Sequence, residues 1–363
     1  MLTERRQFLA SALALAQGAP FRLAVAGLAH GHARGFLTLL GRHPDVELVG
    51  VSDPSSELLA AHASRHSIPR ERLFGDLAEM LDRTRPEAVA LFGSTWDHAA
   101  GVEACAARKL PVMMEKPLAV SLEHARRIAA AARRSGIPVI VNYETTWYRS
   151  HAALWEFFKV RKAGGPIRKM VAMDGHMGPR EIGVGPEFFA WLTDPKLNGA
   201  GALFDFGCYG ANLMTWMMDN ARPKAVTART LQIKPDIYPK VDDEATVVLD
   251  YAGAQGIIQA SWNWPYHRKD FEVYGAGAYA HAIGGNVVRL KPGARDAEQT
   301  VTPPELPPDE ADAVAYLRAV ARGRLKVSGL SSLENNLIST EILVAARESA
   351  RLGRTVGLEL VNK

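Results

Sequence analysis

Val112-Met113-Met114-Glu115-Lys116-Pro117 joins a short apolar run to a charged pair and a proline. The run is uncharged and short enough to be a buried parallel strand. In open α/β sheets, ligands bind just beyond the carboxyl ends of such strands, so Glu115 and Lys116 are expected at a binding crevice. Pro117 disfavours helical geometry at Lys116, and the next helix is expected to begin at Ser121. The alternative for these residues alone is a Glu-Lys pair on the surface at a strand end.

A turn that contains glycines follows the first apolar run of the chain. Residues 21–26 predict a strand, and a helical pattern begins near residue 32. Glycines between them allow the backbone to approach a pyrophosphate, while the helix N-terminus supplies N–H groups. Only the first glycine of the dinucleotide fingerprint is present, because alanine and histidine occupy its second and third positions. The candidate cofactor-binding residues of this turn are Gly27, Ala29, His30, Gly31 and His32.

The second apolar run ends in an acid. Residues 46–53 predict a strand that finishes at Asp53, at about the separation expected for a carboxylate that binds the adenosine ribose. A carboxylate there repels the 2′-phosphate of NADP, and Pro54-Ser55-Ser56 offers no arginine to compensate. NAD is therefore favoured over NADP. The alternative role for Asp53 is to cap the helix that follows.

Strand and helix patterns alternate up to Asn142. Further strands are expected at residues 72–75, 88–92 and 137–141. This alternation is typical of a doubly wound parallel sheet, and we expect an α/β Rossmann domain that binds NAD(P) over residues 21–142. The loop Gly93–His98 is expected at the same edge as Lys116, where His98 faces the cofactor or caps its helix.

The second half of the chain has a different pattern. Strand-like runs follow one another mostly without helices, at residues 170–173, 224–230, 245–250, 255–261 and 271–274. We expect an α+β domain over residues 143–363, with a large, mostly antiparallel open sheet whose free face packs on another subunit. Helices at about 310–321 and 333–351 complete it. The expected assembly is a homodimer or homotetramer through this sheet.

A second motif, Gly199-Ala-Gly201-Ala-Leu-Phe-Asp205-Phe-Gly207-Cys-Tyr209, combines glycines with two polar side chains. A spacing of four residues places Asp205 and Tyr209 on one face of a helix, and the glycines permit close approach of a ligand. Apolar residues follow and should bury the rest of the helix, so the polar groups at its start are expected to serve a site. The alternative is that Tyr209 forms a hydrogen bond within the core.

These two motifs together resemble the glucose–fructose oxidoreductase, inositol dehydrogenase and rhizopine-catabolism (Gfo/Idh/MocA) family, from about Phe21 to the last helix. The resemblance implies a sugar-type oxidoreductase in which Lys116, Asp205 and Tyr209 are catalytic and face the nicotinamide of NAD or NADP. The tyrosine matches the glucose–fructose oxidoreductase branch. We expect Tyr209 to be the general acid/base, Lys116 to hold the reacting hydroxyl and lower the pKa of Tyr209, and Asp205 to orient the substrate or the lysine.

The sequence departs from its relatives where the substrate is expected. Thr146 and Trp147 stand where relatives often have Arg-Phe, so the sugar is not identified. Trp147 and His176 are candidate substrate contacts, the latter because glycines flank its loop. A set of aromatic residues is a further candidate, with core packing as the default for each: Trp262, Trp264, Tyr266 and His267.

These features predict hydride transfer between nicotinamide and a carbinol or hemiacetal carbon of a sugar or polyol. Two alternatives stay open. A redox-neutral NAD-dependent glycosidase or lyase would use the same lysine, aspartate and tyrosine for transient oxidation and elimination. A non-catalytic nucleotide sensor would bind the cofactor without using them.

Composition restricts the partners. With 363 residues, 47% hydrophobic and 23% charged, the chain is long enough for two globular domains. A net charge of +4 with scattered Lys and Arg gives little support for nucleic-acid binding. Cys105 and Cys208 lack metal-type spacing, and no metal site is expected. No run approaches the roughly 18 apolar residues of a membrane span.

Residues 1–20 form a separate segment. Arg5-Arg6 followed by an apolar, alanine-rich stretch resembles a twin-arginine export signal, with Ala14-Leu15-Ala16 as a candidate cleavage site. We therefore expect export to the periplasm; the alternative is a cytoplasmic protein with an amphipathic extension. Because free NAD is expected to be scarce outside the inner membrane, an exported enzyme should retain its cofactor tightly.

Overall fold

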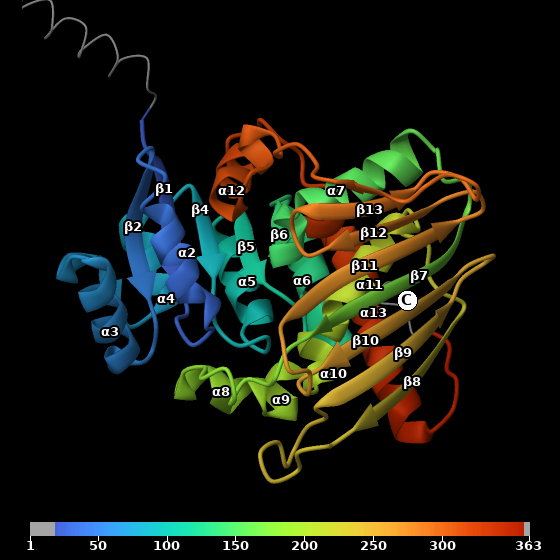
Figure 1. The fold of residues 1–363 in the computed structure, drawn as a ribbon. Coiled ribbons are helices and arrows are strands. Elements are labelled where there is room, and N and C mark those ends of the chain that lie inside the picture. Colours follow the sequence, from blue (N-terminus) through green and yellow to red (C-terminus); the bar gives the residue numbers. More distant parts are fainter. Residues whose placement is uncertain (1–18, 359–363) are drawn as a thin grey trace, which may run out of the picture.

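The computed structural model of the chain describes residues 19–358. The predicted export signal at Arg5 and Arg6 lies outside the described residues. Two sheets dominate the described part (Figure 1). A six-stranded sheet lies at the left of that view and an eight-stranded sheet at the right.

The six-stranded sheet is the predicted doubly wound parallel sheet. Its strand order is β3-β2-β1-β4-β5-β6, and all of its pairs are parallel. The order confirms the Rossmann-like fold, with its switch point between β1 and β4. The strands are β1 (Phe21–Ala26), β2 (Val46–Ser52), β3 (Leu73–Phe74), β4 (Ala88–Leu91), β5 (Val112–Glu115) and β6 (Val139–Asn142). The connecting helices are α2 (His32–Leu40), α3 (Ser56–His66), η1 (Arg70–Arg72), α4 (Leu77–Thr84), α5 (His98–Ala107) and α6 (Leu122–Ser135).

Local sequence signals explain the boundaries of these elements. The Ser121 side chain accepts the N–H of His124 and starts α6, and Gly136 ends it with a left-handed φ of 72°. Gly27 has a φ of +80°, and a Cβ there would lie 2.4 Å from the backbone nitrogen of Gly93. Glycine at position 27 is therefore required by the close packing of the turns that follow β1 and β4.

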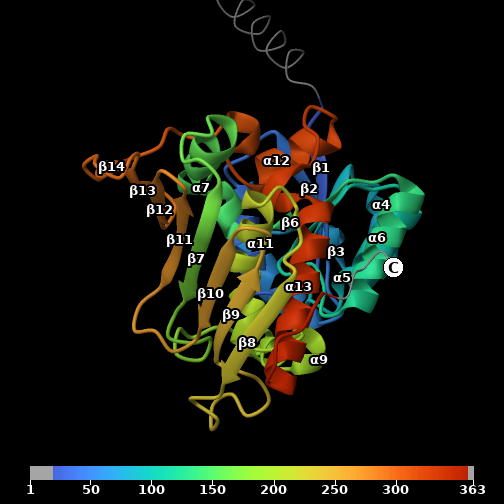
Figure 2. The same cartoon turned by 90° about the vertical axis from the view of Figure 1, so that its right-hand side faces the viewer.

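The eight-stranded sheet is mostly antiparallel, as predicted. Its order is β14-β13-β12-β11-β7-β10-β9-β8, and β7 with β10 is its parallel pair. Helices α11 and α13 cover one face, while no described element covers the other (Figure 2). The strands are β7 (Ile167–Gly175), β8 (Ala225–Leu231), β9 (Glu244–Asp250), β10 (Gln255–Ser261), β11 (Arg268–Gly275), β12 (Tyr279–Ile283), β13 (Val287–Lys291) and β14 (Gln299–Val301).

The remaining helices surround this second sheet or connect it to the first. They are η2 (Glu144–Trp147), α7 (Arg149–Trp155), η3 (Glu156–Val160), α8 (Pro186–Leu192), α9 (Pro195–Asn198), α10 (Ala202–Asp205), α11 (Gly207–Met217), η4 (Pro308–Glu310), α12 (Ala313–Ala321), η5 (Gly329–Ser331) and α13 (Leu333–Leu352). Helices α8 and α9 lie below the carboxyl edge of the parallel sheet in Figure 1. They therefore stand where the ligand crevice of such a sheet is expected.

The two C-terminal helices pack against different parts of the fold. The Asp312 side chain accepts two N–H groups and starts α12, later than the predicted start at Glu310, because residues 308–310 form a separate 3₁₀ turn. Helix α12 shares a core cluster with Phe21 and Ile140 of the parallel sheet. Helix α13 packs on α11 and β8. The chain thus returns to the first sheet before it covers the second.

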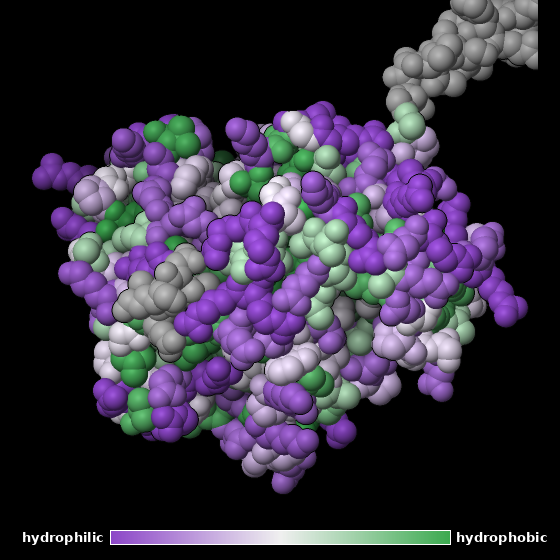
Figure 3. Space-filling model, turned by 180° about the vertical axis from the view of Figure 1, so that it is seen from behind, coloured by the Kyte–Doolittle hydropathy of each residue, from purple (hydrophilic) through white to green (hydrophobic). Residues whose placement is uncertain are grey.

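The described surface is mixed in character. Seen from behind, hydrophilic and smaller hydrophobic areas alternate (Figure 3). Within residues 19–358, no helix combines the length and apolar content that a bilayer crossing requires.

Cys105 and Cys208 are buried free thiols, and burial raises the pKa of each to about 12. Both are therefore inert core residues.

Candidate active site

A cavity of about 670 Å³ is lined by residues from both halves of the fold. This volume is typical of small-molecule and cofactor sites. Lys116 lines it just after β5, Asp205 and Tyr209 line it from α10 and α11, and His176 lines it just after β7. The structure thus brings four residues that the sequence indicated into one cavity.

Lys116 and Asp205 form a buried ion pair. Lys116 Nζ donates to Asp205 Oδ1 at 2.6 Å and to the Asp205 carbonyl oxygen at 3.1 Å, and the Trp262 indole N–H donates to Oδ2 at 2.9 Å. Burial alone would lower the pKa of Lys116, but the charge of Asp205 outweighs it and raises that pKa. Burial alone would raise the pKa of Asp205, but Lys116 lowers it to about 2. Both groups are therefore charged at neutral pH.

Asp205 and Tyr209 do not lie on one continuous helix, contrary to the prediction. Helix α10 ends at Asp205, and Phe206 (φ −105°, ψ −33°) separates it from α11, which begins at Gly207. The Asp242 carboxylate accepts two backbone N–H groups at the start of α10, at 2.9 and 2.7 Å. These bonds fix α10 as a separate short turn, so the i, i+4 rule does not apply across Phe206.

The cation at the Tyr209 hydroxyl is Lys269, which the sequence did not indicate. Lys269 Nζ donates to Tyr209 Oη at 3.2 Å and also binds Glu144, whereas Lys116 Nζ lies 5.1 Å from the centroid of the tyrosine ring. Burial, with a smaller contribution from Glu144, raises the pKa of Tyr209 well above 10.0. The prediction that Lys116 lowers this pKa is therefore wrong. Tyr209 is a protonated phenol at neutral pH.

Glu115 lies behind the cavity wall. It is 1% exposed; Asn142 Nδ2 donates to one of its oxygens at 2.7 Å, and His32 Nδ1 lies 3.0 Å from the other. Burial raises the pKa of Glu115, but the charge and hydrogen bond of His32 outweigh this and lower it to about 2. The carboxylate therefore joins the β1–α2 turn to the end of β6.

His30, His32 and Glu115 are a residue set that can bind a divalent ion. One potential ligand atom from each lies within 4.8 Å of the others. However, Nδ1 of His30 accepts the backbone N–H of His32 at 3.1 Å. Burial lowers the pKa of His30 well below 6.5, so the ring is neutral and its one proton is on Nε2. In this tautomer Nε2 is a donor, and an ion could bind there only if the bond at Nδ1 were lost.

Helix α8 packs over one side of the predicted cofactor turn, which the sequence did not indicate. Gly31 and His32 line the cavity at the N-terminus of α2. The Trp191 indole N–H donates to the Ala29 carbonyl at 3.1 Å, and the Phe188 ring would be 3.2 Å from a Cβ on Gly31. Helix α8 therefore closes the side of the turn that carries Ala29, and the exposed His32 side remains open to the cavity.

Asp53 does not line this cavity. Its Oδ2 accepts the Leu28 N–H at 2.7 Å and its Oδ1 accepts the Ser55 N–H at 2.8 Å. The residue is 5% exposed. Its contacts hold the β1–α2 turn against the end of β2, and the side chain that caps α3 is Ser55. The helix cap given as the alternative for Asp53 is therefore provided by Ser55, while the ribose contact of Asp53 stays a prediction.

The cavity nevertheless fits a nicotinamide dinucleotide in size and charge. Beyond His32 it is lined by Arg34 of α2 and by His62 and Arg65 of α3. The two arginines and the N-terminus of α2 suit phosphate groups. Lys116 lines the same cavity, together with the acid/base candidate Tyr209. The lining therefore matches a ligand with a charged part and a reactive part.

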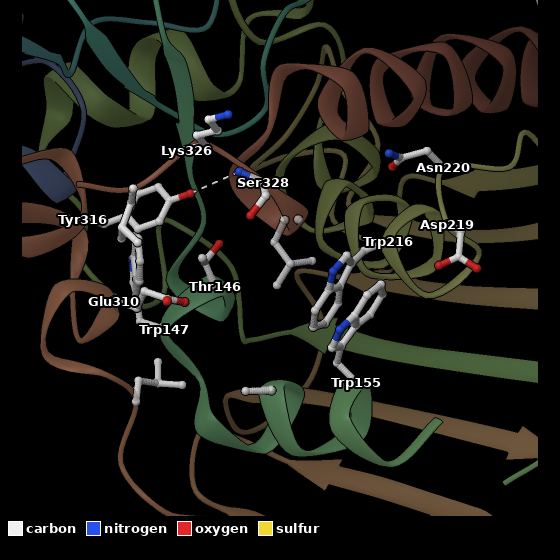
Figure 4. Close-up of a pocket in the computed structure, with 15 residues that line it drawn as sticks. Thr146, Trp147, Trp155, Trp216, Asp219, Asn220, Glu310, Tyr316, Lys326 and Ser328 are labelled. Carbon is white, nitrogen blue, oxygen red and sulfur yellow. Dashed lines mark hydrogen bonds between the residues drawn. The ribbon is translucent and has the colours of Figure 1, made fainter. Parts of the chain in front are cut away.

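His98 and Trp147 also lie outside this cavity. His98 is buried at the start of α5, and its Nδ1 lies 3.2 Å from the Leu118 carbonyl oxygen, so its side chain does not cap the helix. Burial lowers the pKa of His98, and the ring is neutral. Trp147 lines a separate cavity beside Tyr316 (Figure 4). Because η2 turns its ring toward α12, Trp147 is not a contact for a sugar at Lys116.

His176 remains a candidate substrate contact. Its Nδ1 accepts the Gly178 N–H at 2.9 Å, and its ring centroid lies 4.8 Å from that of Phe206. Burial lowers the pKa of His176 to about 4, so the neutral ring offers an Nε2–H donor. His267 of the predicted aromatic set also lines the cavity, whereas the other three do not: Trp262, Trp264 and Tyr266.

Two missed residues carried signals in the sequence. Lys269 lies on the same face of β11 as the buried Phe271 and Val273, and a lysine on the apolar face of a strand is rare unless it has a partner. Glu144 lies two residues after the end of β6, so the rule that placed Lys116 at a carboxyl strand end also applies to it. The alternation pattern and the strand-end rule were sufficient to find both.

Sequence profiles of known families match both halves of the chain. Residues 21–143 match the oxidoreductase family with an NAD-binding Rossmann fold, and residues 163–281 match the GFO/IDH/MocA C-terminal domain. A trans-1,2-dihydrobenzene-1,2-diol dehydrogenase from Xenopus laevis is 26% identical over 60% of this chain and 61% of its own length. A 1,5-anhydro-D-fructose reductase from Ensifer adhaerens is 24% identical over 86% of this chain and 91% of its own.

A solved structure shares the fold. It is an inositol dehydrogenase homolog from Azotobacter vinelandii, complexed with NADH and myo-inositol. The TM-score is 0.78 at 18% identity, over 94% of this chain and 98% of that one. The likeness extends through both sheets of the chain.

Proposed function

The chain belongs to the Gfo/Idh/MocA family of NAD-binding oxidoreductases, and we propose that it moves a hydride between nicotinamide and a carbinol carbon of a sugar or polyol. The observation that carries this proposal is the Lys116–Asp205 ion pair in one cavity with Tyr209. The 1,5-anhydro-D-fructose reductase and the homolog that binds myo-inositol support the substrate class.

Lys116 is proposed to bind the oxygen on the reacting carbon. Its two hydrogen bonds to Asp205 leave the third N–H for a substrate, as far as the described contacts extend. The ion pair keeps the ammonium charged and fixed, so it stabilises negative charge on that oxygen. Asp205 is a positioning residue for the lysine.

Tyr209 is proposed to exchange the proton. In the reducing direction its phenol gives a proton to the substrate oxygen, Lys269 Nζ gives a proton to the phenolate, and solvent restores the ammonium beside Glu144. The Glu144 side chain is 46% exposed and also accepts the Tyr148 hydroxyl at 2.5 Å, so this route reaches the surface. The oxidising direction runs the same transfers backwards.

The residues proposed to hold the cofactor line the outer part of the cavity: Gly31, His32, Arg34 and Arg65. When bound, nicotinamide accepts or supplies the hydride. We propose NAD in preference to NADP, because Asp53 carries a carboxylate at the end of β2. The arginines are the groups that a 2′-phosphate would use instead.

The test is a panel of sugars and polyols with the purified protein and NAD. Cofactor absorbance and product mass are recorded together. Net reduction of NAD with oxidised product supports the proposal. Cleavage of a glycoside without net redox change would indicate the redox-neutral glycosidase or lyase, and bound NAD without any conversion would indicate a sensor.

The uncovered face of the eight-stranded sheet is proposed to form a subunit interface. Half-buried apolar side chains on it are Val171, Met173 and Ile257. An antiparallel sheet with one face already packed can bury the other against a second copy. Light scattering should report a dimer or tetramer, and Ile257→Glu should yield a smaller species. A monomeric wild-type protein would contradict this proposal.

Export through the twin-arginine route is proposed for the full chain. That route carries folded proteins, so it can carry a cofactor that was bound before export. Cell fractionation should place the protein in the periplasm, and Arg5→Lys with Arg6→Lys should retain it in the cytoplasm. Nucleotide released on denaturing the purified protein would support tight retention. Cytoplasmic wild-type protein that purifies empty would contradict both parts.

A further inference from the structure

We infer that the cavity beside Trp147 is a second binding site, which takes one ring of a neutral saccharide. Its volume is about 550 Å³, within the range of small-molecule sites. It shares no lining residue with the cavity at Lys116. The inference therefore stands independently of the proposed hydride transfer.

Aromatic side chains form two opposed walls of this cavity (Figure 4). Trp147 and Tyr316 lie on one side with ring centroids 5.5 Å apart, and Trp216 lies on the other. Trp216 is stacked on Trp155, with centroids 4.4 Å apart and an interplanar angle of 7°. Large, rigid aromatic faces suit the apolar C–H faces of a sugar ring.

The walls are held in place before any ligand binds. The Trp147 indole N–H donates to Asn142 Oδ1 at 3.1 Å, and the Tyr316 hydroxyl accepts the Ser328 N–H at 3.3 Å. Stacking on Trp155 fixes Trp216 in the same way. Because these rings are already ordered, a ligand loses little free energy in fixing them.

Polar side chains complete the lining. Thr146 lies between the two walls in Figure 4, and its hydroxyl oxygen is shielded from solvent without a hydrogen-bond partner among the described residues. This hydroxyl reaches a ligand in the cavity only when the Thr146 side chain rotates toward it, and a ligand hydroxyl then supplies the partner that the group lacks. Asp219 is paired with Lys159, and the other two charged lining residues, Glu310 and Lys326, have opposite signs. The lining thus has no excess charge that would select an ion, and a neutral polyhydroxyl ring fits it.

The test uses fluorine NMR of protein labelled with 5-fluorotryptophan. The chain has seven tryptophans, so each signal can be assigned with one Trp→Phe variant. Glucose, fructose, cellobiose and maltose are titrated separately. We expect saturable shifts of the Trp147 and Trp216 signals with at least one of them, and at least tenfold weaker binding in Trp216→Leu. Trp96→Phe is the matched control, because Trp96 is 38% exposed and does not line this cavity.

Thr146→Val tests the hydroxyl without removing a wall. The variant should bind the same saccharide several-fold more weakly, whereas a merely structural role of Thr146 would leave the affinity unchanged. Shifts confined to Trp191 and Trp262, which contact Phe188 and Asp205 of the cavity at Lys116, would place the saccharide in that cavity. They would overturn this inference and leave the proposed function intact. Binding of indole but of no saccharide would also overturn it, since the site would then be an aromatic-ligand pocket.

Discussion

Lys269 Nζ lies 3.2 Å from the hydroxyl oxygen of Tyr209, whereas Lys116 Nζ lies 2.6 Å from Asp205 Oδ1. Each buried lysine thus has a different partner in one cavity. Lys269 can stabilise a phenolate at Tyr209, and Lys116 is free to act on the substrate oxygen. Separate cations allow proton transfer and charge stabilisation to occur at the same time.

Tyr209→Phe should lower turnover by about 10²-fold or more, because it removes the proton that the substrate oxygen exchanges. Cofactor affinity should change little. Since the pKa of Tyr209 is raised above 10.0, the wild-type oxidation rate should rise with pH between 7 and 10. The variant should lose this slope. Steady-state kinetics across that range provide the measurement, and an unchanged turnover would remove Tyr209 from the mechanism.

Lys269→Met should lower turnover by roughly 10²-fold, because the phenolate at Tyr209 loses its cation. Lys269→Arg should restore part of the rate, since the charge is kept. Lys196→Met is the control, because Lys196 is exposed on α9 and does not line this cavity. The KM should change less than kcat in Lys269→Met. If Lys269→Met has the same kcat as the wild type, Lys269 only packs against Glu144.

The sequence predicted the parts of the fold that depend on local signals. Alternating strands and helices gave the parallel sheet, and caps such as Ser121 and Gly136 gave the helix ends. Local signals failed for β12 (Tyr279–Ile283), because its two alanines have low strand propensity. This strand forms because β11 and β13 pair with it on both sides.

Contacts between distant residues explain what the sequence missed in the site. The break at Phe206 depends on Asp242, which lies far along the chain and holds the start of α10. The position of Asp53 depends on the Leu28 N–H, which turns the carboxylate toward the backbone. The strand-end rule placed Lys116 correctly at the cavity, since that rule follows from topology.

Asp53→Asn should narrow the preference for NAD over NADP, because it removes a negative charge near the adenosine end. It should also lower stability modestly, since the amide replaces an acceptor for the Leu28 and Ser55 N–H groups. Dissociation constants for both cofactors provide the measurement. Tighter binding of NADP than of NAD by the wild-type protein would contradict the preference. Arg65→Gln would then be expected to weaken NADP more than NAD.

Lys116→Met should destabilise the protein by about 3–5 kcal/mol at neutral pH, because it leaves the buried Asp205 carboxylate without its cation. Asp205 has a folded pKa of about 2, below its unfolded value near ~3.9, so its contribution is complete above ~3.9 and is lost as pH falls toward 2. Lys116 has a raised pKa, so its contribution is complete below ~10.4 and is lost only at higher pH. The wild-type pair should therefore be fully stabilising from about pH 4 to about pH 10.

Without Lys116, protonation of Asp205 relieves the unpaired charge. The loss in free energy of unfolding that Lys116→Met shows relative to the wild type should therefore shrink as pH falls from 7 to 4. Lys116→Met with Asp205→Asn should be more stable at pH 7 than Lys116→Met alone, because position 205 no longer carries an unpaired buried charge and the amide oxygen can still accept the Trp262 N–H. Urea denaturation midpoints at several pH values provide the measurement. Arg351→Met is the control, since Arg351 pairs with Glu348 at the surface and its loss should leave the midpoint unchanged. If Lys116→Met loses the same amount of stability relative to the wild type at every pH from 4 to 7, the packing of the lysine, and not its charge, stabilises the site.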